Sequence, residues 1–270
     1  MLLIEDLQVE LSGKLLLRHI DLEIKPGETH VLFGPNGSGK TSLLMTILGM
    51  PGYVVKNGRI VFKGEDITYM PIHERAQLGI GMAFQRPPTI HGLKTRQMVG
   101  ICAHGREVDV QGMAEEVNFG HFLDREVNAG LSGGEIKRSE LLQLMAQNPD
   151  LMLFDEPESG VDMENMHLVG ETIAHLLQKD KAVYHPNGDS IADSRRKRSK
   201  MGLIITHTGY ILDYLEADSG HVLYNGILSC PSNPREILRC VAQNGYQECV
   251  NCMVPLSAHL LEELPTANAD

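Results

Sequence analysis

The sequence has no long apolar run. No stretch of its 270 residues approaches the roughly 18 apolar positions that a membrane-spanning helix needs. Residues 1–20 carry acidic side chains early and no basic segment, which argues against a secretory signal peptide. We therefore expect a cytoplasmic protein without direct membrane insertion. If it serves a membrane, a partner should supply the membrane part.

Basic residues are outnumbered. There are 24 Lys and Arg against 35 Asp and Glu, and the net charge is −11. Because a nucleic-acid-binding surface needs clustered cations to neutralise phosphates, we expect no nucleic-acid partner. One basic run exists, residues 195–200, inside a polar loop or long insertion over residues 179–200 that Gly and Pro punctuate. The run is either a solvated loop or a partner-binding patch.

Cysteine is sparse over most of the chain. One of the five is Cys102, and the others are Cys230, Cys240, Cys249 and Cys252. A cytosolic chain keeps its thiols reduced, so a disulfide scaffold is not expected. The C-terminal four are either small, buried or idle thiols of a helical tail, or thiolates that contact a metal or an iron–sulfur cluster. A C-x-x-C pair on a helix lacks the knuckle turn of a zinc site, which favours the first interpretation.

A glycine-rich segment, residues 34–41, fits the phosphate-loop pattern G-x-x-x-x-G-K-[ST]. A buried strand over 30–33 precedes it, and an apolar helix over 41–48 follows. The backbone N–H groups of such a loop and the positive end of the helix bind phosphate oxygens. Lys40 is expected to reach the β- and γ-phosphates, and the Thr41 hydroxyl to bind Mg²⁺. The expected nucleotide-binding residues of this segment are Gly34, Pro35, Asn36, Gly37, Ser38, Gly39, Lys40, Thr41 and Ser42.

The rest of the pattern predicts an α/β protein. Residues 1–35 contain short alternating runs typical of antiparallel strands, and residues 57–68 predict a further strand with Asn57 and Gly58 as its turn. From about residue 87 to 148 no strong strand occurs, and short helices are expected. Buried strands are predicted over 151–154 and 203–205, with a helix over 164–178 between them and a helical tail after residue 231.

Two acidic residues follow the predicted strand 151–154. A strand delivers such side chains to its C-terminal end, where ligands gather in open α/β sheets. Asp155 is suited to support Mg²⁺ from behind its direct ligands, and Glu156 is suited to polarise the attacking water.

A second loop of small residues lies between these motifs. Residues 131–135 read Leu-Ser-Gly-Gly-Glu and open a helix, where free N–H groups and the helix dipole form an anion site. The local sequence alone favours an ordinary helix with Ser132 as its N-cap, and the order of the motifs along the chain favours the anion site.

In their order along the chain, these motifs resemble the ATP-binding-cassette ATPases over nearly the full length. The resemblance rests on the phosphate loop, Gln85 after Ala83-Phe84, the signature 131–135, the acidic strand 151–156, the turn 159–162 and Thr206-His207. It implies a P-loop (RecA-like) core with an N-terminal antiparallel β-subdomain, residues 1–86 and 149–230. It also implies an inserted α-helical subdomain with the signature, residues 87–148, and a C-terminal tail, residues 231–270.

The same resemblance implies roles for individual residues. Gln85 is similar to the glutamine near Mg²⁺ and the attacking water, His207 to the switch histidine at the γ-phosphate, and Asp162 to the aspartate that contacts the opposite subunit. The catalytic set is then Glu156, His207 and Gln85, the metal set Thr41, Gln85 and Asp155, and the bound species ATP and Mg²⁺.

Pairing follows from the family's logic. The phosphate loop of one copy and Ser132, Gly133 and Gly134 of another would enclose each ATP, so that two chains associate head to tail. One element departs from the family: residues 11–16, where an aromatic usually stacks on adenine, contain none. Loose base recognition or apolar contact is expected there.

Within the superfamily, the residues around Glu135, Glu158 and His207 resemble SufC-type ATPases of the SUF iron–sulfur cluster assembly system. This resemblance implies a soluble complex of two ATPase copies with two SufB/SufD-like scaffold subunits, which would dock near residues 86–99. The insertion and the cysteine-bearing tail suggest a divergent, archaeal-type form. The alternatives are the ATPase subunit of a membrane transporter and a DNA-maintenance ATPase, and the net acidity argues against the second.

Overall fold

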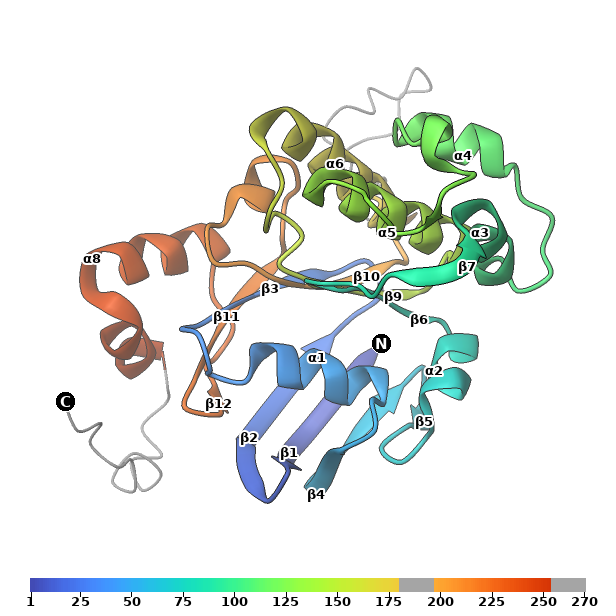
Figure 1. Ribbon diagram of the computed structural model, residues 1–270. Coiled ribbons are helices and arrows are strands. Elements are labelled where there is room, and N and C mark those ends of the chain that lie inside the picture. Colours follow the sequence, from blue (N-terminus) through green and yellow to red (C-terminus); the bar gives the residue numbers. More distant parts are fainter. Residues whose placement is uncertain (180–196, 254–270) are drawn as a thin grey trace.

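The computed structural model describes residues 1–179 and 197–253 (Figure 1). Its strands are β1 (Leu2–Leu11), β2 (Lys14–Ile24), β3 (Thr29–Phe33), β4 (Tyr53–Phe62), β5 (Glu65–Asp66), β6 (Ile80–Ala83), β7 (Ile90–Lys94), β8 (Glu126–Val127), β9 (Leu151–Asp155), β10 (Met201–Ile205), β11 (Ser219–Tyr224) and β12 (Ile227–Leu228). Its helices are α1 (Lys40–Leu48), α2 (Ile72–Leu78), α3 (Thr95–Cys102), α4 (Val110–Glu116), α5 (Gly133–Gln147), α6 (Met163–Leu176) and α8 (Pro234–Met253), with short 3₁₀ turns η1 (Gly120–Phe122) and η2 (Tyr210–Asp213).

Within these ranges, ten strands form one sheet in the order β5-β4-β1-β2-β12-β11-β3-β10-β9-β6. Strands β11, β3, β10, β9 and β6 run parallel. Every residue of β3, β9 and β10 is buried, as expected for parallel strands covered on both faces. The strands β3, β6, β9 and β10 therefore end at one edge, which is the usual ligand edge of such a sheet.

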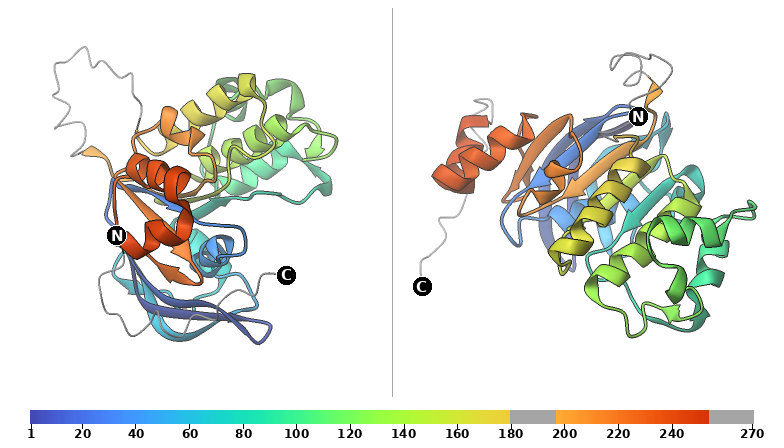
Figure 2. Two further views of the ribbon diagram at one scale, coloured as in Figure 1. Left: turned by 90° about the vertical axis from the view of Figure 1, so that its left-hand side faces the viewer. Right: turned by 90° about the horizontal axis from the view of Figure 1, so that it is seen from above.

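Helices cover both faces of the parallel strands. Helix α1 lies between them and the antiparallel strands β1, β2 and β4, and its apolar residues share one core with those strands (Figure 1). Helices α5, α6 and α8 contribute to a second core with β3, β9, β10 and β11. Helix α8 lies on the side of the molecule away from α3 and α4 (Figure 2). None of the helices in the described ranges is long and apolar enough to cross a bilayer.

The antiparallel half differs from the sequence prediction at one point. Asn57 and Gly58 do not form a turn but lie inside β4, opposite β1. The register between β1 and β4 shifts near Asp6, whose φ is 44°, and Gly58 takes a φ of 83°. A Cβ at Gly58 would lie 2.3 Å from the carbonyl oxygen of Glu5, so only glycine fits this bulge.

The region between residues 87 and 148 is mainly helical, as predicted. Helices α3, α4 and α5 share a third apolar core that includes Val99, Phe119 and Leu142. A small antiparallel pair, β7 and β8, was not predicted. The mostly exposed residues of β7 carry no clear apolar alternation, which is why the sequence does not mark this strand.

Parts of the predicted insertion and tail lie outside the described residues. These are residues 180–196, which include Arg195 and Arg196 of the basic run, and residues 254–270. At the end of that run, the Nζ of Lys200 donates to the carbonyl oxygens of Asn148 and Pro149. The described part of the tail is helical as predicted, in α8 (Pro234–Met253), with a kink at Gly245.

Candidate nucleotide-binding and catalytic site

The phosphate-loop segment connects β3 to α1. Gly34 has a φ of 155°, and a Cβ there would meet the carbonyl oxygen of Leu223 at 2.3 Å. Gly39 has a φ of 106°, and a Cβ there would lie 2.9 Å from the Leu17 side chain. Both glycines therefore let the loop pass close to neighbouring strands, and α1 begins directly after Gly39 with its N-terminal end on this loop.

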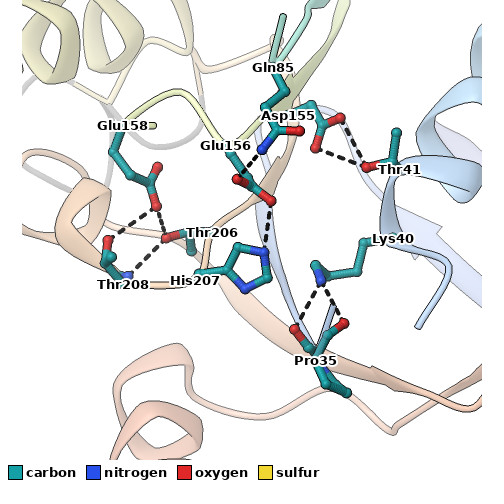
Figure 3. Close-up of polar contacts among 12 residues, drawn as sticks. Pro35, Lys40, Thr41, Gln85, Asp155, Glu156, Glu158, Thr206, His207 and Thr208 are labelled. Atoms are coloured by element: carbon teal, nitrogen blue, oxygen red, sulfur yellow. Dashed lines mark hydrogen bonds and ion pairs between the residues drawn. The ribbon is translucent and has the colours of Figure 1, made fainter. Parts of the chain in front are cut away.

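Lys40 is folded back onto its own loop. Its Nζ donates to the carbonyl oxygens of Gly34 at 2.9 Å and Pro35 at 3.0 Å, and the residue is 6% exposed (Figure 3). Burial lowers the pKa of the Lys40 ammonium, while the carboxylates of Glu156 and Asp155 raise it. A bound phosphate would offer this cation a stronger, charged acceptor than the two carbonyls.

Thr41 and Asp155, two of the residues that the sequence predicts as the metal set, contact each other. The Thr41 hydroxyl donates to the two carboxylate oxygens of Asp155 at 3.1 and 3.3 Å. Burial raises the pKa of the Asp155 carboxyl, and the hydrogen bond from Thr41 opposes that shift. The buried Ser38 hydroxyl of the same loop has no hydrogen-bond partner among the described residues. A hydroxyl, a carboxylate and an orphaned buried oxygen at a helix N-terminus suit a hard cation with phosphate.

Glu156 stands between two other strand ends. Its Oε2 accepts a hydrogen bond from the Gln85 amide, and its Oε1 lies 2.7 Å from the His207 Nε2 (Figure 3). Glu156 follows β9, Gln85 follows β6 and His207 follows β10, so the parallel neighbours deliver the three side chains to one place. The structure thus brings together the three residues that the sequence predicts as catalytic.

Glu158 organises the segment around His207. It accepts hydrogen bonds from the hydroxyls of Thr206 and Thr208, the two neighbours of His207 in the chain (Figure 3). The Thr206 hydroxyl in turn accepts the N–H of Gly209. Glu158 is not among the site residues that the sequence predicts. Its nearness to Glu156 in the chain was the available signal.

The signature residues cap α5. The Ser132 side chain accepts the N–H of Glu135, and the Glu135 carboxylate accepts the N–H of Ser132, a reciprocal capping box. The bond from the Ser132 backbone is the main cause that lowers the pKa of Glu135. A Cβ at Gly133 would lie 2.1 Å from the carbonyl oxygen of Gly160, so the signature packs against the turn 159–162 of its own chain.

Asp162 caps α6 and faces solvent. Its carboxylate accepts the backbone N–H of Asn165 at 2.8 Å, and this bond is the main cause that lowers its pKa. A cavity of about 320 Å³ separates this turn from the catalytic residues, and Glu156, His207 and Tyr210 are among its lining. The exposed side chains of Met163 and Tyr210 border it.

The start of β2 lies beside the phosphate loop. The carbonyl oxygen of Leu16 and the side chain of Leu17 are both within contact range of Gly39. Leu15, in the stretch that lacks an aromatic, is 41% exposed.

Among the described residues, no group of three or more His, Cys, Asp or Glu side chains could hold a metal ion. Cys102, Cys230 and Cys240 are free thiols, and Cys249 is buried. The side chain of Cys252 lies outside the description, so both interpretations of the C-terminal cysteines stand.

Proteins with related sequences match most of this chain. Residues 17–159 match the family model described as ABC transporter. A probable ATP-dependent transporter SufC of Escherichia coli is 34% identical over 261 residues, which cover 91% of this chain and 97% of that protein. Vegetative protein 296 of Bacillus subtilis is 33% identical over 258 residues, which cover 91% of each chain.

An archaeal relative is no more similar than these two. An uncharacterized ABC transporter ATP-binding protein of Methanocaldococcus jannaschii is 32% identical over 262 residues, covering 93% of this chain and 95% of that one. The expectation of an archaeal-type form is therefore not borne out.

A solved structure confirms the predicted fold class. The nucleotide-free ATP-binding cassette of an ABC transporter superposes with a TM-score of 0.71 at 22% identity, covering 92% of this chain and 98% of that one. The arrangement is the mixed α/β cassette with a P-loop that the sequence predicts.

Proposed function

This chain belongs to the ABC transporter family as a SufC-type ATPase that binds and hydrolyses ATP, and from that premise we propose that it works as one half of a head-to-tail pair that reshapes a partner protein. The observation that carries the proposal is the placement of Glu156 between Gln85 and His207. These residues lie at the sheet edge where β3 leads into the phosphate loop. The Glu156 carboxylate is thereby placed near the proposed sites of the nucleotide and of the attacking water. It is also linked through Gln85 to the segment proposed to contact the partner protein.

In the proposed nucleotide complex, Lys40 leaves the carbonyls of Gly34 and Pro35 and binds the β- and γ-phosphates, while the N–H groups of residues 36–42 surround the β-phosphate. Mg²⁺ held by Thr41 and Gln85, with Asp155 behind Thr41, would neutralise charge on the phosphate oxygens. The exposed Leu15 at the start of β2 offers apolar contact to the base in place of an aromatic.

The proposed hydrolytic step needs one proton acceptor and two orienting groups. Glu156 polarises the water that attacks the γ-phosphate. Gln85 and His207 both contact the Glu156 carboxylate. In the proposed nucleotide complex, each of these two side chains could turn towards the water or the γ-phosphate. The hydroxyls of Thr206 and Thr208, held by Glu158, keep the backbone on both sides of His207 in place.

We propose that pairing completes the site. Ser132, Gly133 and Gly134 of a second copy would supply N–H groups to the γ-phosphate, and the exposed Asp162 would contact that copy. Two ATP molecules would then join two chains, and hydrolysis would release them. The division into a core of residues 1–86 and 149–230, a helical subdomain of 87–148 and a tail of 231–270 is part of this proposal, because the signature must move relative to the phosphate loop.

The proposed output is movement of a scaffold rather than transport. Similarity to a protein named SufC over 91% of this chain supports a SufB/SufD-like partner and a role in iron–sulfur cluster assembly, in a soluble cytoplasmic complex of two plus two subunits. Residues 86–99 directly follow Gln85 and are mostly exposed, which supports them as the docking segment.

A membrane transporter is the second candidate. The family model is described as ABC transporter, and the relative from Escherichia coli is named a probable ATP-dependent transporter. The same segment after Gln85 would then contact a membrane-embedded partner.

Affinity purification of the tagged chain from its native host separates the two. We expect a scaffold subunit to co-purify in equal amounts without detergent and to raise the rate of phosphate release. Recovery of a membrane permease, and only in detergent, would contradict the scaffold proposal.

A further inference from the structure

Two oppositely charged side chains of α5 are buried beside the strand end that carries Gln85. Lys137 is 3% exposed and Glu140 is 6% exposed. Side chains of this kind are rarely buried unless they are paired, because removing a charge from water is costly. Their spacing of three residues places them on one face of α5. Neither residue is among the site residues that the sequence predicts.

Both side chains bind the backbone at the end of β6. Lys137 Nζ donates to the carbonyl oxygen of Phe84 at 2.6 Å and to that of Gln85 at 3.1 Å. The Phe84 N–H donates to Glu140 Oε1 at 3.0 Å. One helical face therefore holds both polar backbone groups of Phe84 and the carbonyl of Gln85.

These bonds link two parts of the proposed site that are far apart in the chain. Helix α5 begins with the signature, where Ser132 is its N-cap. The clamped backbone carries the Gln85 side chain, which donates to Glu156. We propose that Lys137 and Glu140 are positioning residues that transmit displacement of the signature end of α5 to Gln85, and through Gln85 to Glu156. The inference rests on the roles proposed above for Gln85 and Glu156.

The burial of Lys137 and Glu140 favours a role in positioning the Gln85 backbone over a role in stabilising the fold. Burial lowers the pKa of Lys137, and burial raises the pKa of Glu140 to about 7. Glu140 Oε2 has no hydrogen-bond partner among the described residues, and Lys137 Nζ lies 4.0 Å from it. A buried pair that is satisfied this incompletely stabilises a fold less than apolar side chains of similar size would. What it does supply is a defined location for the backbone that carries Gln85.

The full-length chain offers a matched control on the same helix. Gln147 Nε2 donates to the carbonyl oxygen of Ile80, so Gln147 ties α5 to the opposite end of β6, away from Gln85. The test compares Lys137→Met, Glu140→Leu, Glu140→Gln and Gln147→Met. Each variant is measured for thermal stability, for kcat and KM of ATP hydrolysis, and for hydrogen–deuterium exchange at the Phe84 amide.

We expect Lys137→Met and Glu140→Leu to lower kcat about tenfold or more with KM for ATP within about twofold, because the lost bonds hold the backbone that carries Gln85 and do not bind ATP. The Phe84 amide should exchange faster in Glu140→Leu. Glu140→Gln keeps an acceptor oxygen for that amide and should retain both protection and most of kcat. Gln147→Met should leave kcat within about twofold of the unmodified chain.

Folded Lys137→Met or Glu140→Leu protein with unchanged kcat would overturn the proposal, as would an equal loss of kcat in Gln147→Met. If Glu140→Leu does not fold, Lys137→Met and Glu140→Gln still decide the outcome. Failure of the underlying assignment has a different signature. If the roles proposed for Gln85 and Glu156 are wrong, Glu156→Gln would retain turnover. Hydrogen–deuterium exchange at the Phe84 amide would still show whether Glu140 binds that amide.

Discussion

Replacement of Glu156 by Gln tests the centre of the site with little change in shape. Glu156 accepts hydrogen bonds at both carboxylate oxygens, one from Gln85 and the other at His207. An amide keeps one acceptor and gains a donor. Gln85 can rotate its own amide to present its oxygen, so both contacts can survive in Glu156→Gln. The fold should therefore be retained, while the group that polarises water is lost.

The expected loss of kcat is that of a missing general base, because the fold is retained. Loss of a positioned general base costs roughly 10²- to 10⁴-fold in rate, and we expect kcat to fall by at least about a hundredfold. ATP binding should persist, because Lys40, Thr41 and the phosphate-loop backbone are untouched. With ATP bound and not hydrolysed, the variant should accumulate as a dimer.

Two assays check these outcomes. Phosphate release measures kcat, and light scattering after size exclusion measures mass with and without Mg-ATP. Glu156→Ala serves as the comparison, because it leaves Gln85 and His207 without their shared acceptor and should also lower stability. Turnover of Glu156→Gln within about threefold of the unmodified chain would refute the assignment of the base. A monomer at saturating ATP would refute pairing of the isolated chain.

Three further outcomes are expected. Lys40→Ala should abolish ATP binding in a fluorescent-nucleotide titration, and retained affinity would refute the phosphate-loop assignment. Arg75→Met should lower the free energy of unfolding by about 3 kcal/mol in a urea titration, since the buried guanidinium donates to four backbone carbonyl oxygens, and a loss below about 1 kcal/mol would contradict this. Stability should fall as pH drops from about 6.5 towards about 4, because burial lowers the pKa of His30 and lowers that of His221 to about 4, so the unfolded state takes up more protons over this range. His221→Asn should flatten that dependence in pH-resolved thermal melts, and an unchanged slope would show that other groups cause it.

The hydrogen bonds of Lys40 and Glu156 indicate what the proposed nucleotide complex would change. Lys40 occupies two carbonyls of its own loop, and Glu156 is held by Gln85 and His207. Each of the two charged groups therefore has two partners within the protein. In the proposed nucleotide complex, ATP would replace the neutral acceptors of Lys40 by charged ones, and this difference in affinity would shift the population towards an active form.

Local sequence patterns do not predict features that depend on a neighbouring strand or helix. Asn57 and Gly58 look like a turn, yet they lie inside β4 because a bulge in β1 near Asp6 absorbs the positive φ of Gly58. Lys137 and Glu140 carry no local signal of burial, and the packing of α5 against β6 buries both. Neither outcome can be inferred from spacing, because each depends on a segment distant in the chain.

By itself the sequence determined the chemistry that consecutive residues carry. The phosphate loop works through successive backbone N–H groups and the start of one helix, so residues 34–41 specify it locally. The tertiary structure alone decided which side chains meet. Glu156 contacts Gln85 and His207 across 71 and 51 positions of sequence, because neighbouring parallel strands end at one edge of the sheet. The hydrogen bonds of Lys137 and Glu140 to the backbone after β6 depend on how α5 packs against that strand. Their proposed role therefore follows from burial and not from their spacing in the sequence.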